Sequence, residues 1–178
     1  MIHDQDRSGW IGASDTAKVM GNWNTKSFDT FWREKLGIYH KKINTTAMAT
    51  GTAFEGKILD ALGIKKRDRQ ICIPGLRLRV NLDGEDEIIH EVKTHKSEVF
   101  RISKAYWQQA QVEMFAAKKE LVIDAYRLEP EDYGNWMREI DPKRLSRHPI
   151  AYDKEWVETE YLPRLQYLAE CLKEGRWP

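Results

Sequence analysis

Apolar residues in the first third of the chain recur at the spacing of amphipathic helices. We predict helices over residues 15–20, 28–36 and 47–62, the first with Ser14 as its N-cap. Each is followed by a glycine, a residue that commonly ends helices because it accepts a positive φ. The N-terminal part of the chain, 1–63, is therefore expected to be helical.

The pattern changes to alternation in the middle of the chain. Apolar and polar residues alternate over 76–83 and predict a half-buried strand. After a turn at 84–86, the Ile- and Val-rich segment 87–94 predicts a second strand. The remaining predicted elements are a helix over about 99–118, a strand over 121–128, and a helical tail over about 153–174 that Pro163 breaks or kinks.

This order of elements indicates an α+β fold, an α/β sandwich in which helices pack on a central sheet. A chain of 178 residues is long enough to bury its own core as one domain. Within that domain we expect a helical part over 1–63, a sheet core over 70–128 and a helical C-terminal tail over 150–178.

Composition narrows the class of protein. Lys and Arg number 29 against 28 Asp and Glu, and the net charge of +1 argues against a protein that binds polyanions through a global positive excess. A local basic groove stays compatible with that number. No secretion signal and no membrane span are readable, so a cytoplasmic protein is expected. Cys72 and Cys171 are expected to be reduced thiols, with one disulfide as the alternative.

Three acidic residues and a lysine stand in otherwise apolar surroundings. Glu55 falls on the apolar stripe of the predicted helix 47–62, where a carboxylate needs a cation or solvent. Asp83 ends the first predicted strand, and Glu91 and Lys93 share one face of the second. A hairpin of these strands would bring the three together. Taken singly, each residue also fits a simpler interpretation: a helix edge, an Asp-Gly turn or a solvated strand face.

Such a group of oxygens suits a hard divalent cation. Asp83, Glu91 and a backbone carbonyl form a candidate Mg²⁺ or Mn²⁺ site. A metal there lowers the pKa of a bound water and neutralises charge on a phosphodiester, and Lys93 stabilises the transition state. On the next predicted helix, Gln109 is placed to hydrogen-bond a carboxylate or water, although an exposed glutamine is the simpler interpretation.

Five short blocks occur in order along the chain. They are Gly12-Ala13-Ser14-Asp15, Gly51-Thr52-Ala53-Phe54-Glu55, Asn81-Leu82-Asp83-Gly84, Glu91-Val92-Lys93, and Ala105-Tyr106 continued by Gln109-Ala110-Gln111. Together they resemble the PD-(D/E)XK nucleases, most closely the lambda exonuclease and YqaJ-like viral recombinase family. The resemblance spans nearly the whole chain and implies a restriction-endonuclease-like core, with a mixed β-sheet flanked by helices.

By that resemblance, the catalytic residues are Glu55, Asp83, Glu91, Lys93 and Gln109. Asp83, Glu91 and the Val92 carbonyl would bind Mg²⁺, for which Mn²⁺ can substitute, and Glu55 would bind it directly or through water. The resemblance implies 5′-to-3′ hydrolysis of linear double-stranded DNA from 5′-phosphorylated ends. It also implies phage-type recombination with a single-strand annealing recombinase, a trimeric ring, and a location in the host cytoplasm.

Five further residues are candidate DNA contacts. Arg7 and Ser14 fall where the family holds the 5′ phosphate of DNA. Arg77 and Arg79 are expected on the Asp83 face of their strand, and Lys96 follows the second strand.

Two other classes of function stay open. A DNA endonuclease of restriction or repair type would use the same residues, and a catalytically silent DNA-end-binding protein would use the same groove. The presence of every catalytic position disfavours the silent protein. The basic run 65–69 is expected to be a solvated loop, with a path along the phosphate backbone as the alternative. Leu82 and Val99 stand where the family has a proline and a further arginine.

Overall fold

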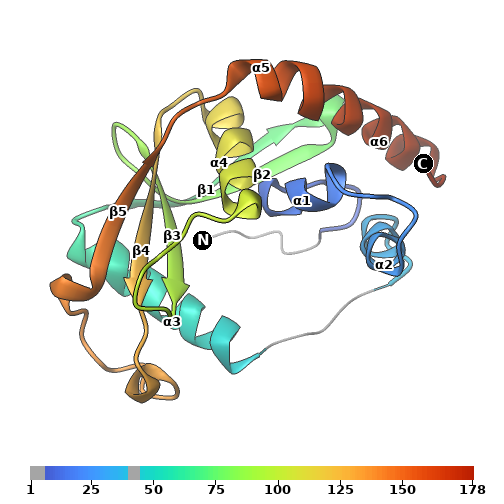
Figure 1. The fold of residues 1–178 in the computed structure, drawn as a ribbon. Helices are drawn as coiled ribbons and strands as arrows, with labels where there is room; N and C mark the ends of the chain where they lie inside the picture. Colours follow the sequence, from blue (N-terminus) through green and yellow to red (C-terminus); the bar gives the residue numbers. More distant parts are fainter. Residues whose placement is uncertain (1–6, 40–44) are drawn as a thin grey trace.

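The computed structural model describes residues 7–39 and 45–178, in which five strands form one mixed sheet (Figure 1). Residues 1–6, where we expect no secretion signal, and 40–44 lie outside the described residues. In spatial order the strands are β1 (Lys66–Ile73), β2 (Leu78–Glu85), β3 (Ile89–His95), β4 (Leu121–Arg127) and β5 (Leu145–Ile150). Neighbours pair antiparallel except β3 and β4, which run parallel. The predicted α+β class and mixed sheet are confirmed.

The helices are α1 (Thr16–Val19), α2 (Lys26–Lys35), α3 (Thr46–Ala61), α4 (Lys104–Ala117), α5 (Lys154–Trp156) and α6 (Leu162–Glu174). Threonine and serine side chains cap α2, α3 and α4. The hydroxyls of Thr25, Thr45 and Ser103 accept backbone hydrogen bonds at the starts of α2, α3 and α4. The predicted cap at Ser14 is wrong: Ser14 lies inside a 3₁₀ turn, and the Asp15 carboxylate binds the Gly12 amide at 2.8 Å instead.

Helices cover both faces of the sheet and bury two apolar clusters. On one face, α4 and α6 pack with the inward side chains of β2 and β4, among them Leu82 and Ile123. On the other face, α3 contributes Phe54 and Ile58, which pack with Val92 of β3. Because side chains alternate along β3, Glu91 and Lys93 face α4 while Val92 faces α3, as the sequence predicts.

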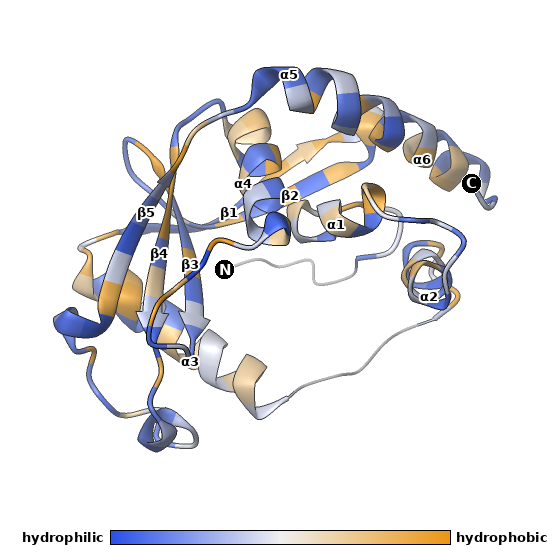
Figure 2. Ribbon diagram, viewed as in Figure 1, coloured by the Kyte–Doolittle hydropathy of each residue, from blue (hydrophilic) through white to orange (hydrophobic). Residues whose placement is uncertain are grey.

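Both edge strands were missed by sequence reasoning. The run 65–69 is the start of β1 rather than a loop, and its arginines make ion pairs: Arg67 with Asp60 at 2.6 Å and Arg69 with Glu85 at 2.9 Å. Strand β5 contains Pro149 and is mostly hydrophilic (Figure 2). Charged residues and proline are typical of edge strands, because an edge strand has a hydrogen-bonded neighbour on one side only. The sheet therefore extends beyond the predicted core 70–128 on both sides.

Two predicted boundaries also shift. Gly84 and Glu85 belong to β2, and the turn to β3 comes at 86–88, where Asp86 accepts a hydrogen bond from the Ile88 amide at 2.9 Å. In the tail, helical backbone runs without a break from α5 through a π-helical turn (Val157–Tyr161) into α6. Pro163, which has no N–H to donate to the preceding turn, comes just after the π-helical turn.

The short 3₁₀ turns complete the described chain. They are Ala13–Asp15, Pro74–Leu76, Pro130–Asp132 and Pro142–Arg144. Cys72 is exposed, Cys171 is buried, and neither forms a disulfide. Over residues 7–39 and 45–178, every helix is too short or too polar to cross a bilayer.

Candidate active site

The two acids predicted from the hairpin flank the point where β2 and β3 separate. The ladder between these strands ends at the pair Gly84–His90, so Asp83 and Glu91, one residue further along each strand, lie just beyond it. The Asp83 side chain spans the gap: its Oδ2 accepts a hydrogen bond from the Val92 amide at 2.9 Å. The hairpin therefore brings the two acids together, as predicted.

Helix α3 approaches this gap closely because β2 carries a glycine there. A Cβ on Gly84 would lie 2.7 Å from Cδ2 of Leu59 and 2.9 Å from Cγ2 of Ile64, distances that side chains do not tolerate. With no side chain at that position, α3 packs directly on the strand. Glu55 of α3 consequently lines the same cavity as Asp83.

Lys93 lies beside Glu91 and is held by three contacts. Its Nζ donates to Glu91 Oε1 at 2.5 Å and to Gln109 Oε1 at 3.3 Å, and it lies 5.0 Å from the centroid of the Tyr106 ring. Burial alone would lower the pKa of Lys93, but the charge and hydrogen bond of Glu91 hold that pKa above its ordinary value. Lys93 is therefore an ammonium ion at neutral pH.

Gln109 connects the predicted residues to an acid that sequence reasoning missed. Its Nε2 donates to Glu91 Oε1 at 2.6 Å and to Glu113 Oε1 at 2.8 Å. Glu113 is fully buried one turn further along α4 and lines the same cavity. The available signal was the i,i+4 spacing of Gln109 and Glu113, with the apolar Val112 and Met114 on either side of the glutamate.

The carboxyl groups of the site are crowded. Burial, reinforced by the charge of Glu91, raises the pKa of Asp83 and of Glu113 well above the ordinary range, and the same two causes raise the pKa of Glu55. The Oε2 atoms of Glu91 and Glu113 are buried and have no hydrogen-bond partner among the described residues. Crowding of this kind is typical of functional sites, where a further positive group offsets it.

The donor set fits a divalent cation in its chemistry. Among the residues that the structure describes, no three His, Cys, Asp or Glu side chains converge as a ready metal site, and Glu91 Oε1 is bonded to Lys93 and Gln109. Glu91 nevertheless keeps one buried oxygen without a partner, beside the acids Asp83 and Glu55. Carboxylate oxygens are the ligands that Mg²⁺ and Mn²⁺ prefer.

The segment before α1 supplies a basic side to the cavity. Ile11 pairs with the start of β2 through two backbone hydrogen bonds of 2.8 and 2.9 Å. Arg7, Ser14 and Arg79 therefore line the cavity of about 290 Å³ that Asp83 also lines. Three of the five candidate DNA contacts are thus brought to the acids.

The other two candidate DNA contacts lie elsewhere. Arg77 comes before β2, in the left-handed conformation with φ 48°, so its predicted place on the Asp83 face of the strand is wrong; a 3₁₀ turn ends at this residue and delays the strand. Lys96 is exposed and lines a separate hollow. Sequence reasoning missed Lys35, which is buried in the cavity wall and paired with Asp15 at 2.6 Å.

Solved structures share this architecture. The crystal structure of a phage-related exonuclease from Haemophilus somnus 129PT superposes with a TM-score of 0.69 at 14% identity, over 93% of this chain and 95% of that one. LHK-Exo, an alkaline exonuclease from Laribacter hongkongensis, superposes with a TM-score of 0.62 at 17% identity, over 94% and 93%. Its complex with dAMP gives 0.68 at 18% identity, over 94% and 90%. The chain has the same fold as these exonucleases.

The exonuclease fold is what the five sequence blocks predict, and that part of the resemblance is confirmed. No family model and no curated protein matches the sequence. At 14–18% identity the solved structures establish the fold alone, so the roles of individual residues rest on the geometry of the site.

Proposed function

We propose that this protein is a metal-dependent DNA exonuclease that hydrolyses phosphodiester bonds of linear double-stranded DNA, starting from 5′-phosphorylated ends. One observation carries the proposal: Asp83, Glu55 and Gln109 line a single cavity together with Arg7 and Ser14. Groups suited to hydrolysis and groups suited to a terminal phosphate therefore lie within one nucleotide-sized space. The exonuclease fold supports the proposal, as does the mononucleotide dAMP in LHK-Exo.

Lys93 is the residue that acts on the scissile phosphate. Its ammonium group is fixed by Glu91 and Gln109, so it stabilises negative charge on the phosphate without having to reorient. Gln109, which donates to Glu91, holds this acid in place. Mg²⁺ bound by Asp83, Glu91 and the Val92 carbonyl, with Glu55 direct or through water, would neutralise charge on the phosphate and activate a water.

Arg7 and Ser14 hold the terminal phosphate. Arg79 is almost completely buried and lines the same side of the cavity, so its charge is felt strongly by an anion there. A guanidinium and a hydroxyl bind a phosphate monoester better than a hydroxyl-ended strand, because the monoester carries more charge and more acceptors. Preference for 5′-phosphorylated ends follows.

An end-labelled digestion assay tests the proposal. Linear duplexes with 5′-phosphate or 5′-hydroxyl ends and a covalently closed circle are compared with and without Mg²⁺. We expect Mg²⁺-dependent release of 5′ nucleotides, fastest from the phosphorylated end, and no cutting of the circle. Efficient cutting of the circle would instead establish an endonuclease, and DNA binding without cutting would establish the silent end-binding protein.

The biological setting belongs to the same proposal. A 5′-to-3′ exonuclease leaves a 3′ single strand, which is the substrate of a single-strand annealing recombinase in phage-type recombination, and the host cytoplasm is where that reaction takes place. The trimeric ring implied by the family resemblance is tested by light scattering of the purified protein, where a monomer would exclude it.

A further inference from the structure

The side of the cavity that we assign to the terminal phosphate contains an acid. Asp15 directly follows Ser14 in the 3₁₀ turn, and both residues line the cavity. The Asp15 side chain is only 15% exposed. A phosphate that enters beside such a carboxylate is repelled, because like charges interact strongly where water is scarce. A phosphate site at this place therefore needs a group that offsets the charge of Asp15.

That group is Lys35, the last residue of α2. Its Nζ lies 2.6 Å from Asp15 Oδ2, and its side chain is 2% exposed. The ammonium also lies 5.3 Å from the centroid of the Phe31 ring. A buried ion pair adds little stability compared with apolar residues of similar size. A role in binding therefore accounts better for the place of this pair in the cavity wall.

The pair also joins the two segments that carry the candidate phosphate-binding residues. Asp15 Oδ2 accepts a second hydrogen bond, from the Gly12 amide at 2.8 Å, which closes the turn that carries Ser14. The Lys35 carbonyl accepts a hydrogen bond from the Gly9 amide at 2.7 Å, which attaches the segment before α1 to the end of α2. Lys35 thus contacts both segments, one through its side chain and one through its backbone.

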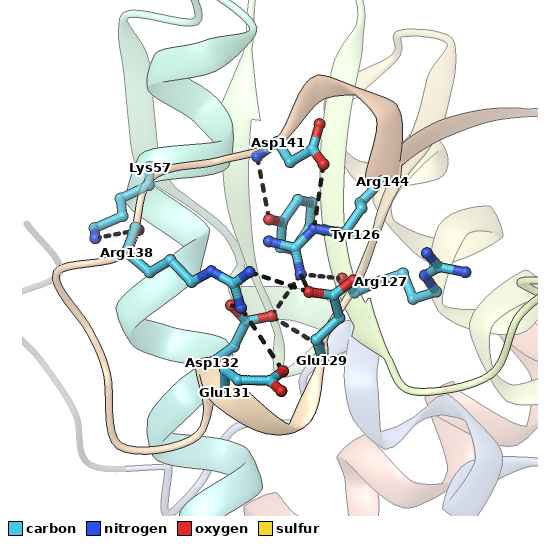
Figure 3. A network of polar contacts seen from close by, with 9 residues as sticks. All are labelled: Lys57, Tyr126, Arg127, Glu129, Glu131, Asp132, Arg138, Asp141 and Arg144. Carbon is cyan, nitrogen blue, oxygen red and sulfur yellow. Dashed lines mark hydrogen bonds and ion pairs between the residues drawn. The ribbon is translucent and has the colours of Figure 1, made fainter.

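A second buried acid of the chain is balanced in a different place. In Figure 3, Asp132 is bonded to Arg144 at 2.7 Å and to Arg138 at 3.1 Å, within the segment between β4 and β5. None of these three residues lines the catalytic cavity, so their charges stabilise the fold. Asp15 and Lys35 both line that cavity, so the balance of their charges acts on an anion that binds there.

We propose that Lys35 is a positioning residue that determines the preference for 5′-phosphorylated ends. Its ammonium holds and neutralises the carboxylate of Asp15. The guanidinium groups of Arg7 and Arg79 then act on the phosphate without an opposing charge. Without Lys35, the formal charge of the cavity wall falls by one beside the phosphate. The inference rests on the proposed function, which places the terminal phosphate next to Ser14.

Binding of duplexes with 5′-phosphate or 5′-hydroxyl ends tests this proposal. The Lys93→Ala protein, which is expected to bind DNA without cutting it, is titrated with each labelled duplex in Mg²⁺, and anisotropy gives the ratio of the two Kd values. Lys35→Met in this background is expected to lower the preference for phosphate about ten-fold, because the uncompensated Asp15 opposes the phosphate more than the hydroxyl. Arg33→Met is the matched control. It removes an exposed ion pair of the same helix, with Asp29 at 2.9 Å, and is expected to keep the preference.

Two further variants separate charge from folding. Asp15→Asn combined with Lys35→Met removes both charges, keeps an oxygen for the Gly12 amide, and is expected to restore the preference to within about two-fold of the parent. Asp15→Asn alone leaves the ammonium without its counter-charge and is expected to increase the preference. This single variant keeps the test decisive if Lys35→Met does not fold.

The outcomes that contradict the two proposals differ. A preference that is the same in the parent, Lys35→Met and Asp15→Asn would overturn the role of Lys35. A double variant that binds no better than Lys35→Met would also overturn it, because a purely structural lysine is not rescued by removing Asp15. If the parent protein itself does not prefer the phosphorylated end, the proposed function fails instead.

Discussion

Two clusters of buried acids in this molecule have opposite electrostatics. In the segment between β4 and β5, burial would raise the pKa of Asp132, but hydrogen bonds from Arg144 and the Glu129 amide hold that pKa below its ordinary value. In the candidate active site, the half-buried Asp83 and the buried Glu113 accept hydrogen bonds from the Val92 amide and from Gln109 but have no arginine partner, and their pKa values are raised. Acids that hold the fold together have their charges balanced by arginines. Acids of the site are left short of positive charge.

The largest expected effect is loss of activity when the ammonium that is bonded to Glu91 is removed. Lys93→Ala is expected to lower kcat by about 10³-fold, because fixed charge stabilisation of a transition state is worth that much. DNA binding, followed by anisotropy, is expected to stay within about two-fold of wild type, since Arg7, Ser14 and Arg79 remain. Near-wild-type cleavage by this variant would remove Lys93 from the mechanism.

Breaking the balanced cluster is expected to cost stability rather than activity. Arg144→Ala leaves Asp132 buried with its best partner gone and is expected to lower the free energy of unfolding by about 3–5 kcal/mol, measured by urea denaturation. Arg138→Ala is the matched control. Arg138 also contacts Asp132, at 3.1 Å, but its side chain is 35% exposed, so a loss of about 1 kcal/mol is expected. Equal losses in the two variants would contradict the assignment of Arg144 as the main partner.

A substitution of Glu113 tests whether this buried acid of the candidate active site contributes to catalysis. Glu113→Gln keeps the size of the side chain but replaces one carboxylate oxygen by an NH₂ group. The carboxylate that accepts the hydrogen bond of Gln109 is then lost, and the Gln109 amide can rotate away from Glu91. We expect kcat to fall about ten-fold at constant KM, a loss typical of a residue that positions a catalytic group. Glu170→Gln, an exposed change on α6, is the control. Unchanged kcat in Glu113→Gln would leave Glu113 a purely structural residue.

The smallest expected effect is a gain in stability. Since the pKa of Asp83 is raised in the folded state, the native protein binds more protons than the unfolded chain above the ordinary carboxyl pKa, and metal-free stability falls as the pH rises through that range. Asp83→Asn removes this cost and is expected to raise the Tm of the metal-free protein at pH 8 by about 2–4 °C, equivalent to about 1 kcal/mol. A lowered Tm would mean that the hydrogen bond donated by the Val92 amide, which is weaker to an asparagine oxygen than to a carboxylate, outweighs the cost of the charge.

Part of the candidate active site could be predicted from the sequence. The acids and Lys93 follow from periodicity, because a strand with period two puts Glu91 and Lys93 on one face and a hairpin brings Asp83 to them. The solved structures confirm the fold that the five blocks predict. The roles of the site residues stay predictions, although the structure brings the predicted catalytic residues together.

The features that were missed are those without a periodic apolar signal. Strand β1 opens with a run of charges and β5 contains a proline, so neither shows the alternation of a buried strand. Glu113 was missed for a different reason. Glutamate is a common residue on exposed helix faces, and the sequence does not show that this position of α4 is buried. Arg77 was misplaced because a 3₁₀ turn shifted the start of its strand by two residues.

The separation of β2 from β3 has a mechanical consequence. Two pairs of residues, Gly84 with His90 and Glu85 with Ile89, join these strands, and the acids lie just past them. Beyond these pairs each strand is held along its length by its other neighbour, β2 by β1 and β3 by β4. The opening that Asp83 and Glu91 flank is therefore set by the whole sheet rather than by the hairpin alone.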